Sequence, residues 1–200
     1  DLALCRATMA GEKNRFKLRV RFYADDLKSH AFFEIKRRLN DVILKQRVQV
    51  RRSSVERLLA GHWPRRSDLV NPARGNFGAL QRFCELRDRI RAKGWAFVCY
   101  AREAYVPPDN NTVRVTFDRN LMSWRYREDF GLKRSSSVVR PRVGGVILEV
   151  KFTDRFPRWI RQMVRIFGLE RTSMPKYVMC TKELLKSGSP VLAEYLGSAR

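Results

Sequence analysis

Six stretches of the chain alternate apolar residues with charged ones, and most of the charged residues are cations. Alternation with a period of two is typical of a β-strand, whose successive side chains point to opposite faces of the sheet. In the clearest case one face is apolar and the other cationic: Phe16, Leu18, Val20 and Phe22 against Lys17, Arg19 and Arg21. So many positive charges on one side of a sheet repel each other unless an anion lies among them. The pattern therefore predicts a protein that binds a polyanion.

The composition supports this interpretation without naming the anion. The 200 residues include 42 Lys and Arg against 20 Asp and Glu, which gives a net charge of +22. Such an excess favours nucleic acid, polyphosphate, nucleotides or an anionic membrane surface as the partner. Hydrophobic residues make up 44% of the chain, which indicates a folded protein with a core. The length suits one domain spanning residues 1–200.

The cysteines and histidines give no sign of disulfides or of a histidine metal site. His30 and His62 are far apart in the sequence. The scattered cysteines predict buried free thiols in a reducing cytoplasm: Cys5, Cys84, Cys99 and Cys180. No apolar run approaches the roughly 20 residues that a membrane span needs, so we expect no transmembrane segment and a cytoplasmic protein.

The order of the expected elements favours an α+β fold with a mainly antiparallel sheet. We expect strands at residues 16–23, 31–38, 41–52, 95–105, 112–118 and 143–153, and helices at 55–60, 77–93, 157–167 and 181–186. Residues 123–142 are polar and are expected to form a loop. The helix aromatics Phe77, Phe83, Trp159 and Phe167 are expected to pack in the core. A sheet that curls into a barrel would point its cationic faces at one lumen, with helices outside.

The few acidic residues on the cationic faces leave two interpretations open. Glu34, Asp118 and Glu149 each lie singly among cations. Neighbouring Arg residues can satisfy such a carboxylate, or it can hold a divalent metal that bridges to phosphate oxygens. Each charged face taken alone can also be an ordinary solvated surface. A shared cationic lumen, by contrast, suits a triphosphate, because Arg binds phosphate in a bidentate manner and Lys adds a point charge.

At these strands the sequence resembles the VTC domain, the polyphosphate-polymerase branch of the triphosphate tunnel metalloenzyme fold, which is related to CYTH domains. The resemblance rests on segments 18–23, 32–36, 100–102, 113–118, 148–151 and 173–177, which occur in the family's order. It implies an antiparallel β-barrel, and the family's opening strand would precede Asp1. The implied reaction is transfer of the ATP γ-phosphate onto a polyphosphate chain, with Mn²⁺ or Mg²⁺ as cofactor. Family members act at or beside membranes, so association with a membrane protein partner is expected.

The resemblance and the strand faces together assign roles to individual residues. Those expected to bind phosphate are Arg19, Arg21, Lys36, Lys45, Tyr100, Arg102, Arg114, Lys151 and Lys176. Among them Lys36, Arg102 and Arg114 are expected to be catalytic. Glu149 is expected to hold the metal, and Glu34 is either a metal or water ligand or an ion-pair partner of Lys36 or Arg38.

Three other functions use the same surface. The chain can be a sensor that binds polyphosphate or triphosphate without turnover, or an inorganic triphosphatase. A nucleic-acid binder is the third, but it would need aromatic residues on the cationic faces for base stacking. Only Tyr23 and Tyr100 are candidates there, so we expect no nucleic-acid partner.

Overall fold

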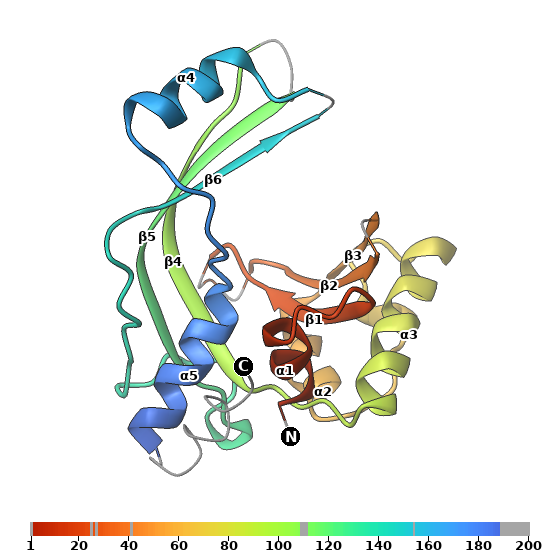
Figure 1. Ribbon diagram of the computed structural model, residues 1–200. Coiled ribbons are helices and arrows are strands. Elements are labelled where there is room, and N and C mark those ends of the chain that lie inside the picture. Colours follow the sequence, from red (N-terminus) through yellow and green to blue (C-terminus); the bar gives the residue numbers. More distant parts are fainter. Residues whose placement is uncertain are drawn as a thin grey trace. The chain divides into compact units, whose positions relative to one another are not determined.

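A computed structural model describes residues 2–24, 26, 28–40, 42–108, 112–153 and 155–188 (Figure 1). These residues form two compact units. The first unit comprises residues 2–95 and 125–134, and the second comprises residues 96–124 and 135–188. Each unit is described below by itself.

The first unit is built on a three-stranded antiparallel sheet. Its strands are β1 (Arg15–Arg21), β2 (Ala31–Leu39) and β3 (Val42–Val50), in that order across the sheet. The helices of this unit are α1 (Ala3–Met9), α2 (Val55–Leu59) and α3 (Arg74–Arg89), with 3-10 turns at Arg52–Ser54, Arg66–Asp68 and Glu128–Phe130. The helix α3 packs against β2 and β3 (Figure 1).

One face of this sheet forms the core because its residues are apolar at every second position. Phe33 and Ile35 of β2 and Val48 of β3 are almost completely buried, together with Leu58 of α2 and Leu80 of α3. Phe16, Leu18 and Val20 of β1 pack against the edge of this cluster. The apolar half of the predicted alternation is therefore confirmed, and it turns the charged half of each strand to the opposite face.

Two polar side chains, Arg87 and Glu56, connect α2 to neighbouring segments through hydrogen bonds. The buried guanidinium of Arg87, on α3, donates hydrogen bonds to the backbone carbonyls of Leu58 and Gly61 and so ties α3 to the end of α2. The carboxylate of Glu56 accepts a hydrogen bond from the amide of Leu132 at 3.1 Å, which attaches residues 125–134 to this unit.

The second unit contains another three-stranded antiparallel sheet. Its strands are β4 (Ala96–Tyr105), β5 (Val113–Arg125) and β6 (Ile147–Phe152), and its helices are α4 (Arg158–Ile166) and α5 (Lys176–Gly188). The helix α5 packs against β4, whereas α4 lies beside the end of the sheet at which β4 ends and β5 begins (Figure 1).

Several expected boundaries were wrong. Strand β5 does not end at 118 but continues to Arg125, through Asn120, which has a positive φ of 56°. In this extension Ser123 exchanges backbone hydrogen bonds with Val139. Helix α5 begins at Lys176, five residues earlier than expected, and α1 was not expected at all. Trp159 and Phe167 are exposed, although core packing was expected for both.

The mixed α+β class with antiparallel sheets is confirmed. A closed barrel is not found among the residues that the structure describes, and it stays a prediction, as does the single-domain organisation. Cys5, Cys84 and Cys180 are buried free thiols as expected, while Cys99 is exposed. Within the described ranges, each helix is too short or too polar to cross a bilayer.

Leucine-to-alanine substitutions should have different effects on stability in the core and at the exposed end of the hairpin β2–β3. Leu58 is 0% exposed and Leu39 is 43% exposed. Leu58→Ala should lower the free energy of unfolding by about 3 kcal/mol, because it leaves a cavity in close-packed surroundings. Leu39→Ala should change it by less than about 0.5 kcal/mol. Urea unfolding followed by circular dichroism measures both, and equal losses would contradict this placement of the core.

Candidate functional site: two cationic sheet faces

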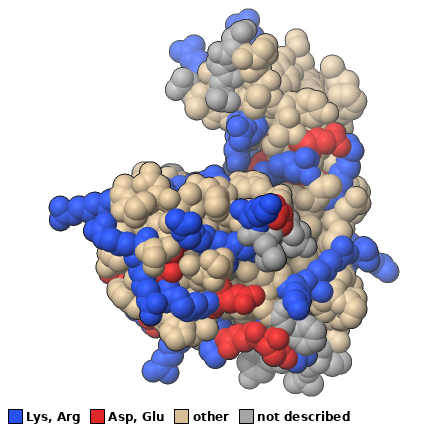
Figure 2. All heavy atoms as spheres, turned by 180° about the vertical axis from the view of Figure 1, so that it is seen from behind, with Lys and Arg blue, Asp and Glu red and all other residues tan. Residues whose placement is uncertain are grey.

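The face of the β1–β2–β3 sheet opposite the core carries a dense group of cations. We call it the cationic face. Its cations alternate with the core residues along the three strands and are Arg15, Lys17, Arg19, Arg21, Lys36, Arg38, Lys45 and Arg47. Figure 2 shows Lys and Arg side chains spread widely over one view of the molecule, so net charge alone does not locate a site. The strand register locates the site, because it shows which cations lie side by side on neighbouring strands.

Three lysines form one row across this face. Lys17 pairs with Lys36 across β1 and β2, and Lys36 pairs with Lys45 across β2 and β3. Like charges directly opposite each other on neighbouring strands destabilise a sheet. Accordingly, burial and the nearby charges of Arg15 and Lys36 lower the pKa of Lys17. A bound anion would remove this repulsion.

The neighbouring row contains one acidic residue, Glu34, between Arg19 and Arg47. Glu34 is only 2% exposed. The Nε of Arg19 donates a hydrogen bond to its Oε2 at 2.8 Å, while Lys45 Nζ and Arg47 Nε each lie 3.5 Å from its Oε1. Burial by itself would raise the pKa of Glu34, but the hydrogen bonds and charge of Arg19 outweigh it and hold the pKa below its ordinary value. Glu34 is therefore an ionised anchor for three cations.

An aromatic pair borders the cationic face. Both Arg21 and Arg47 donate hydrogen bonds to the hydroxyl of Tyr23 at 3.2 Å. These contacts lower the pKa of Tyr23, and the hydrogen bond from Arg21 has the largest effect. The guanidinium of Arg47 also lies 3.7 Å from the centre of the Phe32 ring. These contacts hold two arginine forks in defined positions.

In the second unit, a corresponding face surrounds Asp118. This carboxylate is 2% exposed. Arg102, from β4, donates to both of its oxygens, from Nε at 2.6 Å and from a terminal nitrogen at 2.7 Å. Lys176, from the first turn of α5, places its Nζ 2.7 Å from Oδ2. The ring of Tyr100 lies 5.2 Å from both Arg102 and Lys176. We call these four residues the Asp118 cluster.

The charges within this cluster fix one another. Burial by itself would raise the pKa of Asp118, but hydrogen bonds from Arg102 and Lys176 outweigh it and lower the pKa. The hydrogen bond to Asp118 raises the pKa of Arg102 in turn. Arg102 and Lys176 both stay partly exposed, at 30% and 17% of their side-chain surface. Asp118 thus holds two charged hydrogen-bond donors, Arg102 and Lys176, in positions where solvent can still reach them.

Glu149 and Lys151 of β6 extend this face. In register, Thr116 pairs with Glu149 and Arg114 pairs with Lys151, so two cations again lie directly opposite each other. Glu149 contacts Lys151 at 3.3 Å and Arg102 at 3.4 Å, and 37% of its side chain is exposed. It is held more loosely than Asp118.

The described residues contain no preformed metal centre. Within them, no group of three or more His, Cys, Asp or Glu side chains comes together. A divalent metal would have to take most of its ligands from a bound phosphate. Glu149 fits that arrangement because its carboxylate is accessible and its ion pairs are long. The carboxylate of Glu34 faces three cations, which would repel a metal ion.

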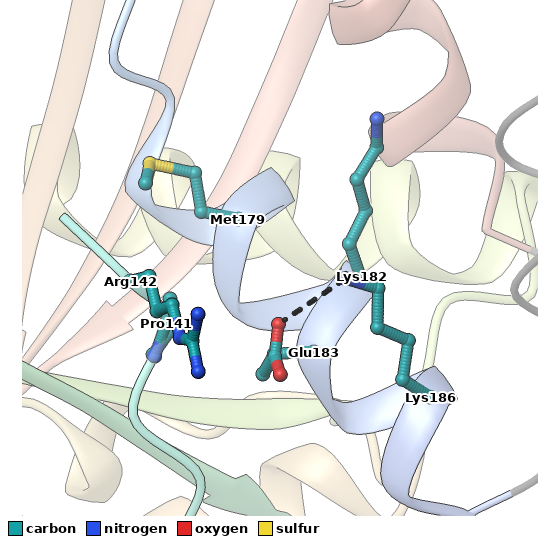
Figure 3. Close-up of a pocket in the computed structure, with 6 residues that line it drawn as sticks. All are labelled: Pro141, Arg142, Met179, Lys182, Glu183 and Lys186. Atoms are coloured by element: carbon teal, nitrogen blue, oxygen red, sulfur yellow. Dashed lines mark ion pairs between the residues drawn. The ribbon is translucent and has the colours of Figure 1, made fainter.

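A hollow of about 440 Å³ lies beside α5, and none of the residues assigned roles above lines it. Pro141, Arg142, Met179, Lys182, Glu183 and Lys186 line it. Figure 3 shows Arg142 and Glu183 facing each other across it, and Lys186 Nζ lies 3.6 Å from Glu183. Its mixed charge makes it a poorer anion site than the two faces.

The structure groups the expected site residues within each unit. Arg19, Lys36, Lys45 and also Arg21 lie on the cationic face, and Tyr100, Arg102 and Lys176 meet around Asp118. The alternation with Leu18 and Val48 placed Lys17 and Arg47 on charged strand faces, but sequence reasoning did not assign a site role to either of them. It noticed Asp118 as an isolated acid, but nothing in the local sequence pairs it with Lys176, which is 58 positions away.

The family model described as the VTC domain matches residues 1–185 of the chain. No curated protein matches it at a significant level.

Replacing Lys17 should stabilise the protein when no anion is bound. At low ionic strength Lys17→Gln should raise the free energy of unfolding by about 0.5 kcal/mol, because it removes repulsion from Lys36. The gain should shrink in roughly 1 M salt, where such repulsion is screened. Lys45→Gln is the control and should give no gain, since Lys45 lies near Glu34. Urea unfolding in both salts measures the difference. Destabilisation by Lys17→Gln would contradict the repulsive row.

Asp118→Asn should cost stability in a pH-dependent manner. At pH 7 the loss should be about 2 kcal/mol, less than for a fully buried pair because Arg102 and Lys176 reach solvent. A lowered pKa contributes stability above the unfolded carboxyl pKa of about 3.9. The gap between the variant and the original protein should therefore close as pH falls through the folded-state pKa of Asp118.

Urea unfolding at pH 7, 4 and 2 measures this gap. The control is Glu103→Gln, which breaks an exposed ion pair with Arg119 between the same two strands and should have little effect at any pH. A gap for Asp118→Asn that stays constant down to pH 2 would show that the ionised carboxylate is not the anchor.

Proposed function

Because the chain belongs to the VTC domain family, whose function is related to polyphosphate, we propose that it binds ATP and polyphosphate through their phosphates on its two cationic sheet faces. The proposed reaction transfers a phosphoryl group from ATP to polyphosphate. The observation that carries this proposal is the row Lys17–Lys36–Lys45 beside the anchored Glu34. Repulsion between neighbouring lysines in such a row lowers the stability of the protein when no anion is bound. A polyphosphate chain carries negative charges at short, regular intervals and so matches the regular spacing of the cations.

The mode of phosphate binding follows from the side chains. Arg21 and Arg47 keep their planar guanidinium groups in place through Tyr23, and planar forks suit bidentate contact with phosphate oxygens. Lys36 and Lys45 supply point charges in the adjacent row. In the second unit Arg102 and Arg114 lie on one face with Lys151, so a phosphate chain there also meets both types of cation.

The resemblance to the tunnel fold extends the proposal to architecture. We propose that the cationic face of each sheet binds a stretch of a phosphate chain, as the strand faces of a tunnel fold would. Glu34 and Asp118 support this assignment because each buries its carboxylate and leaves its cations on the face.

The proposed cofactor is Mn²⁺ or Mg²⁺, with Glu149 as its protein ligand. Glu149 would hold the ion, and the bound ion would supply positive charge that offsets the negative charge of the transferring group. The residues of the chain contribute positioning and electrostatics. Lys36, Arg102 and Arg114 would offset the charge that develops on the phosphoryl oxygens, which requires no covalent nucleophile. Glu34, expected from the sequence as a second ligand, is proposed instead as the anchor of Arg19.

The second candidate is a polyphosphate or triphosphate sensor. The observation that favours it is the pairing of Glu149 with both Arg102 and Lys151, which competes with a metal for that carboxylate. A triphosphatase would use the same groups with water as the acceptor. ATP, triphosphate and polyphosphate are thus the proposed ligands in every version, and a membrane protein remains the proposed partner.

Two substitutions should separate phosphate binding from turnover. Lys36→Gln should weaken the binding of inorganic tripolyphosphate about tenfold or more, because a charge-assisted contact is lost. Glu149→Gln should keep metal-free binding within about threefold and abolish formation of polyphosphate and ADP from ATP and Mn²⁺. Calorimetry measures the binding, and a phosphate-polymer stain with ADP detection measures the reaction.

The matched control is Lys93→Gln, an exposed cation outside the strands, which should leave both quantities unchanged. Tight binding without turnover in any divalent metal would favour the sensor. Failure of the protein to bind tripolyphosphate, or equal weakening by Lys36→Gln and Lys93→Gln, would contradict the proposal itself.

A further inference from the structure

The helix α4 is strongly amphipathic, and its apolar side is wider than the part that the protein buries. Along its nine residues, apolar side chains recur at helical spacing while Arg158, Arg161 and Arg165 share the other side. Ile160 is completely buried. Trp159 is nevertheless 49% exposed, and Ile166 and, just after the helix, Phe167 are 76% and 70% exposed. Large apolar groups that are so exposed on one helix indicate a surface that binds something.

Further apolar side chains are exposed close to the helix. Phe152, at the end of β6, and Phe156, just before α4, are in edge-to-face contact with ring centres 5.2 Å apart, and both are exposed. Leu169 is exposed two residues after Phe167. Tyr105, the last residue of β4, and Val106, the next residue, are also exposed, and β4 ends at the end of the sheet beside which α4 lies (Figure 1). We call the exposed side chains of Phe152, Phe156, Trp159, Ile166, Phe167 and Leu169 the α4 patch.

Arginines surround the α4 patch. Residues 155–171 contain five Arg and one Glu, and all five arginines are exposed: Arg155, Arg158, Arg161, Arg165 and Arg171. A helix with arginines on one side and Trp, Ile and Phe on the other is typical of helices that lie in the plane of a membrane interface. Trp prefers that interface, and arginine side chains extend toward lipid phosphates.

We infer that the α4 patch docks the protein onto the surface of an anionic lipid bilayer, with Trp159, Ile166 and Phe167 inserted among the acyl chains near the headgroups. The arginines make a second copy of the chain a poor occupant, because a symmetric contact would bring five arginines against five others. An anionic bilayer complements both the charge and the apolar side chains. The inference does not depend on phosphoryl transfer.

Vesicle flotation with the full chain tests this surface, using phosphatidylcholine vesicles with and without 30% phosphatidylserine in roughly 0.3 M salt, where weak electrostatic contacts are screened. The triple variant Trp159→Gln, Ile166→Gln and Phe167→Gln keeps the net charge and should lower partition onto the anionic vesicles about tenfold or more. Its control removes equally exposed apolar groups from β3, by Val42→Gln, Ile43→Gln and Leu44→Gln, and should bind like the original protein.

A charge series completes the experiment. Replacing Arg158, Arg161 and Arg165 with Gln should weaken binding more than replacing Arg74, Arg89 and Lys93, which are exposed elsewhere. Circular dichroism verifies that each variant is folded. Undiminished vesicle binding by the apolar triple variant would show that net charge alone causes it and would overturn the inference. So would absence of vesicle binding, including the case in which α4 mediates self-association or binds an acidic protein instead.

Discussion

Two buried carboxylates, Glu34 and Asp118, hold the charged groups of this protein in place. Each is 2% exposed and contacts cations from other elements of its unit. A buried ion pair contributes little net stability, since desolvation offsets most of the attraction, but removal of the carboxylate would leave its cations with unbalanced charge. The effect of such an anchor is therefore positional. It fixes arginine and lysine side chains that would otherwise adopt many rotamers, and so lowers the entropy lost when a phosphate binds.

Cations outnumber the anchors on the faces that the anchors organise. In the first sheet, Glu34 is the acidic residue among eight cations of the cationic face, and the row Lys17–Lys36–Lys45 lies directly beside it. In the second sheet, Arg114 lies opposite Lys151 in the row next to Glu149. A surface selected for stability alone would mix charges of both signs across strands. The observed pattern favours a ligand that supplies the missing negative charge.

The sequence predicted the parts of this arrangement that depend on local periodicity. Alternation along residues 16–22 and 31–38 placed the core and the cations on opposite faces, because a strand's geometry fixes that relation. It did not predict the approach of Lys176 to Asp118, which depends on how α5 packs against β4. The extension of β5 was missed since Asn120 interrupts the alternation with a positive φ. Trp159 and Phe167 were misassigned because a helical pattern does not reveal how much of an apolar side is covered.

The difference between Asp118 and Glu149 argues for a division of roles within one face. Asp118 is buried, receives three short contacts and has a lowered pKa, so its oxygens are committed to Arg102 and Lys176. Glu149 is partly exposed and its two contacts exceed 3.2 Å. A divalent metal needs a carboxylate that can leave its cation partners at small cost, and exposed pairs are weak. Glu149 therefore suits the proposed role of metal ligand, whereas Asp118 suits the positioning of Arg102 and Lys176.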